Sequence, residues 1–155
     1  MLHTKNDALR LGRALEMLLP CSEILVVDHD SADGTRRIAR EYGARIVTAD
    51  SSNSNSYLAL ARHDWVLCMQ PGESITEGLQ ASLFEWSALP GGDVAADGSA
   101  FSVFVREQAG GHWLEHPAPE TRLVSRGWNR WQGRLPAHDP SALTLQGNLL
   151  RFTLP

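Results

Sequence analysis

Short apolar runs alternate with amphipathic segments through the first half of the chain. The apolar runs span residues 23–28, 45–48 and 65–69. Continuous apolar runs favour strands covered on both faces, and their alternation with helices favours parallel βαβ units. The predicted helices run from Asp7 to Leu19, from Thr35 to Tyr42, through Leu58 and Leu60, and from Thr76 through Trp86. The first helix has its apolar positions at Leu9, Leu11, Leu15, Leu18 and Leu19.

The second half of the chain replaces this alternation with short β-like runs. It follows residues 90–99, whose proline and glycines predict a flexible connection. The runs span residues 101–106, 112–114, 122–125, 143–146 and 149–154, and Gly147-Asn148 between the last two is a hairpin signal. We predict a doubly wound α/β fold with a mostly parallel sheet, helices on both faces and an antiparallel C-terminal extension. The predicted organisation is one domain over 1–155, with an α/β half (1–89) and a β-rich extension (100–155).

Composition and charge narrow the class of protein. Hydrophobic residues make up 43% and charged residues 21% of the chain, as in ordinary soluble domains, and the net charge is −4. This balance gives no basic footprint for nucleic acid. No apolar run approaches the roughly 20 residues of a membrane span. Since the two cysteines, Cys21 and Cys68, show no disulfide or zinc spacing, we expect a reducing, cytoplasmic location. The sequence leaves the oligomeric state open.

The stretch from Ile24 to Thr35 carries the first candidate site. An apolar strand ends at Asp28, a polar turn follows, and a helix opens at Asp33-Gly34-Thr35. A carboxylate at the carboxyl end of a parallel strand lies where open α/β sheets bind ligands, and the helix start directs free N–H groups to the same crevice. Asp28 is therefore a candidate ligand-binding residue, although it could also only cap the turn. Asp33 and Thr35 are expected to cap the helix.

Several short motifs follow one another in the order of a known enzyme family. They are Lys5-Asn6-Asp7, the set Asp28, Ser31, Asp33, Gly34 and Thr35, then Glu41–Ala44, Asp64–Leu67, Pro119–Val124 and Trp131–Gly133. On these motifs the chain resembles the family-2 glycosyltransferases over about residues 4 to 137. The resemblance implies a GT-A fold, a nucleotide-sugar donor of UDP type, and a glycan acceptor of the cell envelope or of a polysaccharide.

The resemblance also implies which residues would bind the nucleotide. Thr4, Asn6 and Asp7 would flank the nucleobase and ribose. Asp28, together with Asp30 and Ser31, would hydrogen-bond the base. An ionised carboxylate only accepts hydrogen bonds, which suits the imide N–H of uracil.

The chain departs from the family at the metal motif. The family carries Asp-x-Asp after its fourth strand, where this chain has Gln70 and Gly72, followed by Glu73. Because Mg²⁺ and Mn²⁺ prefer carboxylate oxygens, we expect no metal here, unless Glu73 and Gln70 suffice. Arginines would then supply the positive charge for the diphosphate. The candidates for phosphate or acceptor contacts are Arg122, Arg126, Arg134 and the stacking residue Trp131.

A second departure concerns the catalytic element. The family's Gly-x-Val-His-Glu is replaced here by Gly133–Ala137, which lacks both His and Glu. An inverting transferase needs a base to accept the proton of the acceptor hydroxyl, and Asp139 and Glu120 are the candidates. The sequence therefore leaves two alternatives open. One is an active transferase, and the other is a catalytically inactive GT-A module that binds a nucleotide, a glycan or a protein.

Overall fold

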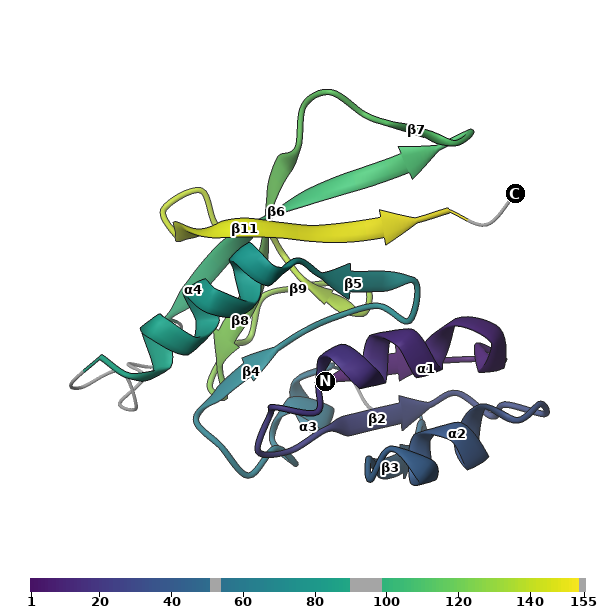
Figure 1. Ribbon diagram of the computed structural model, residues 1–155. Helices are drawn as coiled ribbons and strands as arrows, with labels where there is room; N and C mark the ends of the chain where they lie inside the picture. Colours follow the sequence, from purple (N-terminus) through teal and green to yellow (C-terminus); the bar gives the residue numbers. More distant parts are fainter. Residues whose placement is uncertain (51–53, 90–98, 154–155) are drawn as a thin grey trace.

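The computed structural model describes residues 1–50, 54–89 and 99–153 as a mixed α/β structure (Figure 1). Its four helices in the described ranges are α1 (Ala8–Met17), α2 (Thr35–Glu41), α3 (Ser54–Leu58) and α4 (Glu77–Ser87). The strands of the first half are β1 (Leu2–Thr4), β2 (Leu25–Asp28), β3 (Arg45–Thr48), β4 (Trp65–Leu67) and β5 (Glu73–Ile75). The later strands are β6 (Ala100–Ala109), β7 (His112–Trp113), β8 (Ala118–Ser125), β9 (Trp131–Gln132), β10 (Leu135–Pro136) and β11 (Leu143–Phe152).

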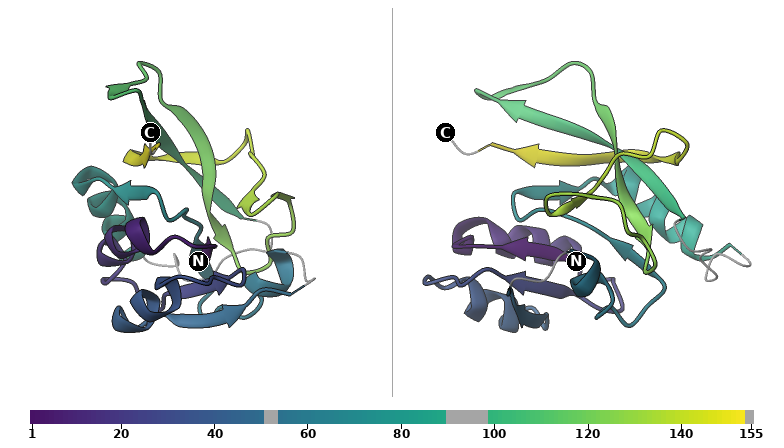
Figure 2. Two further views of the ribbon diagram at one scale, coloured as in Figure 1. Left: turned by 90° about the vertical axis from the view of Figure 1, so that its right-hand side faces the viewer. Right: turned by 180° about the vertical axis from the view of Figure 1, so that it is seen from behind.

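The two larger sheets are joined through the short strand β1. On one side, β1 pairs in parallel with β2, and β2 with β3. On the other side, Leu2 forms a parallel bridge with Met69, and the Met69 N–H donates to the Met1 carbonyl at 3.0 Å. Beyond β4 the strand order continues through β8, β6, β11 and β5. The β2–β3 strands and the β6–β11 pair lie at opposite ends of the molecule (Figure 2). Strand β1 therefore stands at the centre of a continuous, curled arrangement.

Apolar side chains pack on both faces of this arrangement. Within β2, Val26 points to one face and Leu25 and Val27 to the other, as the period of a strand requires. The first face is covered by α1, whose buried residues are Leu11, Ala14 and Leu15, together with residues of β6, β11 and α4. The second face is covered by Tyr57 and Leu58 of α3 and by the fully buried Trp128. Helices on both faces confirm the predicted α/β fold class.

Most predicted elements of the first half are confirmed. Strand β3 has the predicted bounds, α2 ends directly before Tyr42, and Thr76 caps α4 by accepting from the Leu79 N–H at 3.3 Å. Two of the predicted apolar positions of the first helix are wrong. Leu9 is 99% exposed because it lies on the outer side of α1, opposite Leu11, and Leu19 is 56% exposed and lies beyond the end of α1. Strand β5, which the sequence analysis did not predict, follows a sharp turn after Met69.

The predicted hairpin at Gly147-Asn148 is wrong. Residues 143–152 form the single strand β11, which runs parallel to β6 with an irregularity between Leu145 and Asn148. Gly147 has φ +92°, and a Cβ placed on it would lie 2.1 Å from the Leu79 nitrogen of α4. The glycine thus allows a close approach of helix and strand instead of a chain reversal. The antiparallel expectation holds for β4–β8, β6–β8 and β11–β5, but not for β6–β11.

The predicted flexible connection falls largely on residues 90–98, which lie outside the described residues, as does the end of the predicted 149–154 run. Among the helices in the described part of the chain, none combines the length and the apolar composition that a bilayer crossing needs.

Candidate functional site

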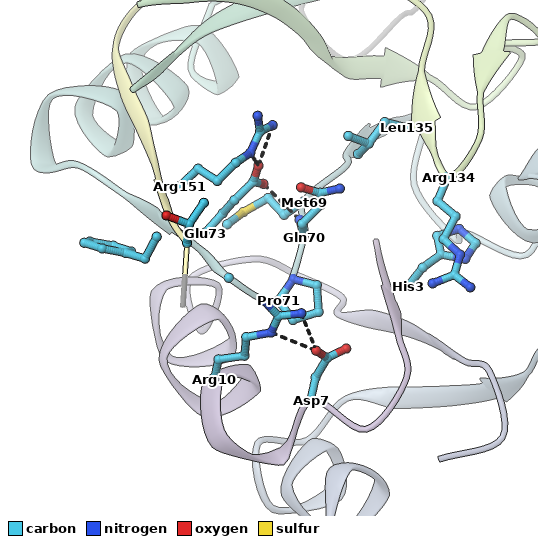
Figure 3. Close-up of a pocket in the computed structure, with 13 residues that line it drawn as sticks. His3, Asp7, Arg10, Met69, Gln70, Pro71, Glu73, Arg134, Leu135 and Arg151 are labelled. Carbon is cyan, nitrogen blue, oxygen red and sulfur yellow. Dashed lines mark hydrogen bonds and ion pairs between the residues drawn. The ribbon is translucent and has the colours of Figure 1, made fainter. Parts of the chain in front are cut away.

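A cavity of about 470 Å³ opens where β1 and the segment after β4 end (Figure 3). Parallel strands present their carboxyl ends to ligands at such a place. The walls come from α1, the 69–73 turn, the segment before β10 and the end of β11. The lining residues are His3, Asp7, Arg10, Met69, Gln70, Pro71, Gly72, Glu73, Arg134, Leu135, Arg151, Phe152 and Thr153.

The turn at 70–73 forms the floor of the cavity and carries the altered metal motif. The Glu73 N–H donates to the Gln70 carbonyl at 3.1 Å, and the Gln70 N–H donates to Glu73 Oε2 at 2.9 Å. These reciprocal bonds hold the turn closed. Gln70 offers a neutral amide to the cavity, and Gly72 offers no side chain.

Glu73 is a partner of buried arginine rather than a free acid. It is 1% exposed and accepts from Arg122 Nη1 and Nη2 at 2.8 and 2.7 Å and from Arg151 Nη2 at 3.2 Å. Because both carboxylate oxygens point at guanidinium groups, Glu73 does not present a ligand set for a cation. In the described residues, no group of three or more His, Cys, Asp or Glu side chains could hold a metal ion.

Arg122 does not reach the cavity, which corrects its predicted role as a phosphate or acceptor contact. Its side chain is 0% exposed, and its Nε and Nη2 donate to Glu120 while Nη1 also donates to the Cys68 carbonyl at 3.1 Å. The arginine instead ties β8 to β5. The burial of Arg122 could not be foreseen, because a buried arginine has no signature of its own in a single sequence.

The two candidate bases, Glu120 and Asp139, also lie outside the cavity lining. Burial would raise the pKa of Glu120, but the Arg122 and Arg151 guanidinium groups outweigh it and lower that pKa. Hydrogen bonds from Ser141, and then Arg130 at 2.9 Å, lower the pKa of Asp139. A carboxylate that is stabilised in its ionised form is a weak proton acceptor. Neither residue lines the cavity, and neither has the raised pKa that would suit a base for a ligand there.

Asp28 lies at the carboxyl end of β2, as predicted, but its side chain is fully engaged. The carboxylate is 0% exposed and accepts from Thr4 Oγ1 at 3.3 Å, from the Ser31 hydroxyl and N–H at 2.5 and 3.1 Å, and from Arg36 Nε at 2.5 Å. Burial would raise the pKa of Asp28, and the Ser31 and Arg36 hydrogen bonds lower it. Asp28 therefore organises the loop around it, and a base could reach it only by displacing one of these donors.

The other predicted nucleotide contacts gather around the same loop. The Asn6 N–H donates to Ser31 Oγ at 2.9 Å, and the Ala32 N–H donates to Asn6 Oδ1 at 2.8 Å. Asn6 and Asp30 both have left-handed backbone angles, φ 54° and 57°. Asp33 accepts from the Thr35 N–H at 2.9 Å, but neither predicted capping residue occupies the N-cap position of α2, which is Gly34. Of the predicted nucleotide set, the cavity lining includes Asp7 alone within the described residues.

Two histidines that the sequence analysis did not single out lie beside this loop. His3 Nδ1 and His29 Nε2 are 2.8 Å apart, and His3 lines the cavity. Burial, followed by the charges of His29 and Arg134, lowers the pKa of His3 to about 4, so its imidazole is neutral at pH 7. The position of His29 directly after β2 was the signal that could have identified this histidine, whereas His3 lies within β1.

Of the remaining candidates, Arg134 lines the cavity, whereas Arg126 and Trp131 lie away from it. Arg126 Nη1 donates to the Ala61 carbonyl at 3.2 Å, and Nη2 lies 3.8 Å from Asp64. Trp131 donates its indole N–H to Asn55 and packs beside the buried Trp128. Arg10 lines the cavity, although sequence reasoning missed it.

Half of the chain is similar in sequence to curated proteins that are named glycosyltransferases. No family model matches the sequence. Over 82 residues the chain is 30% identical to an uncharacterized glycosyltransferase of Rickettsia felis and 32% identical to one of Rickettsia conorii. Each match covers 50% of this chain and 29% of the relative. The chain therefore spans less than a third of the length of the curated relatives it matches.

Solved structures share the fold at low sequence identity. Residues 1–349 of S. aureus TarS match with a TM-score of 0.53 at 16% identity, over 81% of this chain and 45% of that chain. The same protein in complex with UDP matches at 0.51 and 16%, over 75% and 37%. Glucosyl-3-phosphoglycerate synthase of Mycobacterium tuberculosis, in complex with Mn²⁺, UDP and glucosyl-3-phosphoglycerate, matches at 0.50 and 17%, over 70% and 43%. The likeness establishes a fold of the GT-A type.

Proposed function

We propose, from the premise that the chain is a glycosyltransferase relative with a GT-A-type fold, that its cavity binds the nucleotide diphosphate of a sugar donor. The observation that carries this proposal is the position of the cavity. It opens beside the carboxyl end of β1 and the segment 69–73 that follows β4. Three arginines line it, at positions 10, 134 and 151. Arginine is suited to phosphate because its planar guanidinium donates two parallel hydrogen bonds.

The donor in this proposal carries UDP, and the chain belongs to family 2. The order of Lys5-Asn6-Asp7, Asp28, Ser31 and Asp33-Gly34-Thr35 supports the family. The UDP complexes of two proteins with the same fold support the nucleotide. A glycan of the cell envelope or of a polysaccharide is the proposed acceptor for the whole protein, in a cytoplasmic location.

The proposed donor site works without a divalent cation. The residues at the motif do not fit a metal, since Gln70 contributes a neutral amide, Gly72 has no side chain and Glu73 is bound by two arginines. The Mn²⁺ in the mycobacterial synthase belongs to that protein. Here the unpaired guanidinium of Arg134 supports the alternative, because within the described residues no carboxylate forms an ion pair with it.

A second candidate function is a binding module that does not transfer sugar. The engagement of Glu120 and Asp139 with arginine, away from the cavity lining, favours this candidate. A donor site without a nearby base can hold a nucleotide sugar and yet leave the acceptor hydroxyl protonated. The two candidates share the donor site and differ only in turnover.

Thermal unfolding with UDP and UDP-sugars, each with Mn²⁺ and with EDTA, tests the proposal. A ligand that binds only the folded state raises the melting temperature by mass action. We expect the same rise in both conditions, and a smaller one for Arg134→Gln than for the exposed control Arg37→Gln. No rise with any nucleotide at millimolar concentration would contradict donor binding. Release of UDP in the presence of glycan acceptors would separate the transferase from the binding module.

A further inference from the structure

We infer that Arg10 is a phosphate-binding residue of the cavity, and that its guanidinium provides positive charge beside Gly72 where the motif lacks carboxylates for a cation. This inference rests on the proposed donor site and names the group that contacts the diphosphate. Arg10 lies in the first turn of α1 and lines the cavity together with Gly72 (Figure 3).

Asp7 holds the Arg10 side chain in place. Asp7 Oδ1 accepts from Arg10 Nε at 2.8 Å and lies 2.7 Å from Nη2, so the carboxylate takes one edge of the guanidinium. The carboxylate is itself fixed, because Oδ2 accepts from the Lys5 N–H at 2.9 Å and the side chain is 8% exposed. This leaves Nη1 without a protein acceptor among the described residues, and its two N–H groups remain available to a ligand.

Gly72 gives the guanidinium its space. A Cβ placed on Gly72 would lie 3.3 Å from Arg10 Nη1 and 3.4 Å from the Phe152 carbonyl oxygen. Any side chain at this position would crowd the guanidinium or the end of β11. The lack of a side chain at position 72 therefore leaves room for Arg10 of α1. At this place the cavity has a positively charged group and no ligand for a metal cation.

The surrounding charges favour an anion. The cavity lining contains three arginines, residues 10, 134 and 151, against the two carboxylates Asp7 and Glu73. The charge of Glu73 is further neutralised by Arg122, which is buried and does not line the cavity. A diphosphate has several acceptor oxygens, and hydrogen bonds between a charged donor and a charged acceptor are among the strongest that proteins make. A divalent cation, by contrast, would meet excess positive charge.

A purely structural role for Arg10 predicts different behaviour. Its pairing with Asp7 has i,i+3 spacing on a helix, and the arginine side chain is 43% exposed. Asp7 is buried but keeps the Lys5 N–H as a donor, and a Gln amide at position 10 can also donate to it, so Arg10→Gln should retain the fold. A loss of ligand binding in this variant then reports on contact with the ligand.

The experiment measures UDP and uridine binding in EDTA, by calorimetry for UDP and by ligand-observed NMR for uridine. We expect Arg10→Gln to weaken UDP binding by about tenfold or more, the loss of one charged hydrogen bond, and to leave uridine binding unchanged. The control Arg37→Gln removes an arginine that is 76% exposed on α2 and should match the unaltered protein for both ligands.

Each contrary outcome has a distinct meaning. Equal UDP affinity in Arg10→Gln and Arg37→Gln overturns the inference and leaves the proposed donor site intact. Parallel weakening of UDP and uridine assigns Arg10 to ordering the loop and overturns its contact with phosphate. No UDP binding by the unaltered protein, with EDTA or with Mn²⁺, overturns the proposed function and the inference together.

Discussion

At the scale of single residues, the most consequential arrangement is the buried Glu73–Arg122 pair, which together with its partly exposed partners Glu120 and Arg151 forms the buried set. Removing one partner from a buried ion pair leaves a charge without compensation, which costs about 3 kcal/mol or more. Glu73→Gln should therefore lower the free energy of unfolding by about this amount, measured by urea denaturation. Arg122 is 0% exposed, and in this variant it would keep only the partly exposed Glu120 as a counter-charge.

Glu107→Gln is the matched control for this prediction. Glu107 also contacts Arg151, but at 3.8 Å and with a side chain that is 37% exposed. Exposed pairs of this kind contribute within about 1 kcal/mol, so the control should unfold close to the unaltered protein. Equal urea midpoints for the two variants would show that the buried set does not stabilise the fold.

The candidate site was only partly predictable at this scale. The family resemblance grouped Thr4, Asn6, Asp28 and Ser31, and in the structure hydrogen bonds bring these residues together in one loop region. The pairing of Glu73 with Arg122 joins residues 49 positions apart, and it depends on which strands are neighbours. Arg10 was missed because a charge in the first turn of a helix normally belongs to a solvated face.

At the scale of elements, the contact between α4 and β11 depends on Gly147. Gly147→Ala would combine a left-handed φ of +92° with a Cβ 2.1 Å from the Leu79 nitrogen, so helix and strand must separate. The left-handed angle alone costs about 1 to 2 kcal/mol. We expect Gly147→Ala to lose at least about 3 kcal/mol of stability in urea denaturation, because displaced packing adds to the backbone term.

Gly111→Ala separates these two causes. Gly111 has a similar φ of +82°, but a Cβ there would meet nothing within 4 Å. This variant should show the backbone term alone. If both alanine variants unfold at the same urea concentration, the close approach of α4 and β11 is not what requires glycine at position 147.

The same glycine explains why one element was predicted wrongly. A Gly-Asn pair between two apolar runs favours a hairpin as long as only local sequence is considered. In the structure, Thr76 binds the Asn148 backbone, with N–H···O distances of 3.1 and 3.0 Å, and β11 continues past the irregularity to pair with β6 and β5. Partners that are distant in sequence decided the conformation.

At the scale of the whole molecule, the two halves share their cores. One core cluster combines Leu2 and Leu15 with Val103 and Leu149, and the other combines Val27 with Val124 and Trp128. We therefore predict a single cooperative unfolding transition for the chain. Far-UV circular dichroism and tryptophan fluorescence should give the same urea midpoint. Separate midpoints would mean that the predicted α/β half and β-rich extension are independent domains.

The overall architecture was the most predictable level. Alternating apolar and amphipathic segments indicated parallel strands with helices on both faces, and the periodicity alone carries that information. The order of the later strands was not predictable, since β5 and β11 pair across the whole length of the second half. The bridge between Leu2 and Met69, which joins the two sheets, has no local sequence signal either.

The buried charge set also constrains how this sequence can change over evolutionary time. Glu73 could serve as a metal ligand only if Arg122 and Arg151 released it. A single substitution of Arg122 or Arg151 would weaken the compensation of the Glu73 charge, and selection acts against such a loss of stability. New carboxylates at positions 70 and 72 alone would leave Glu73 paired with its arginines. We therefore expect related sequences to keep or to replace these four residues together.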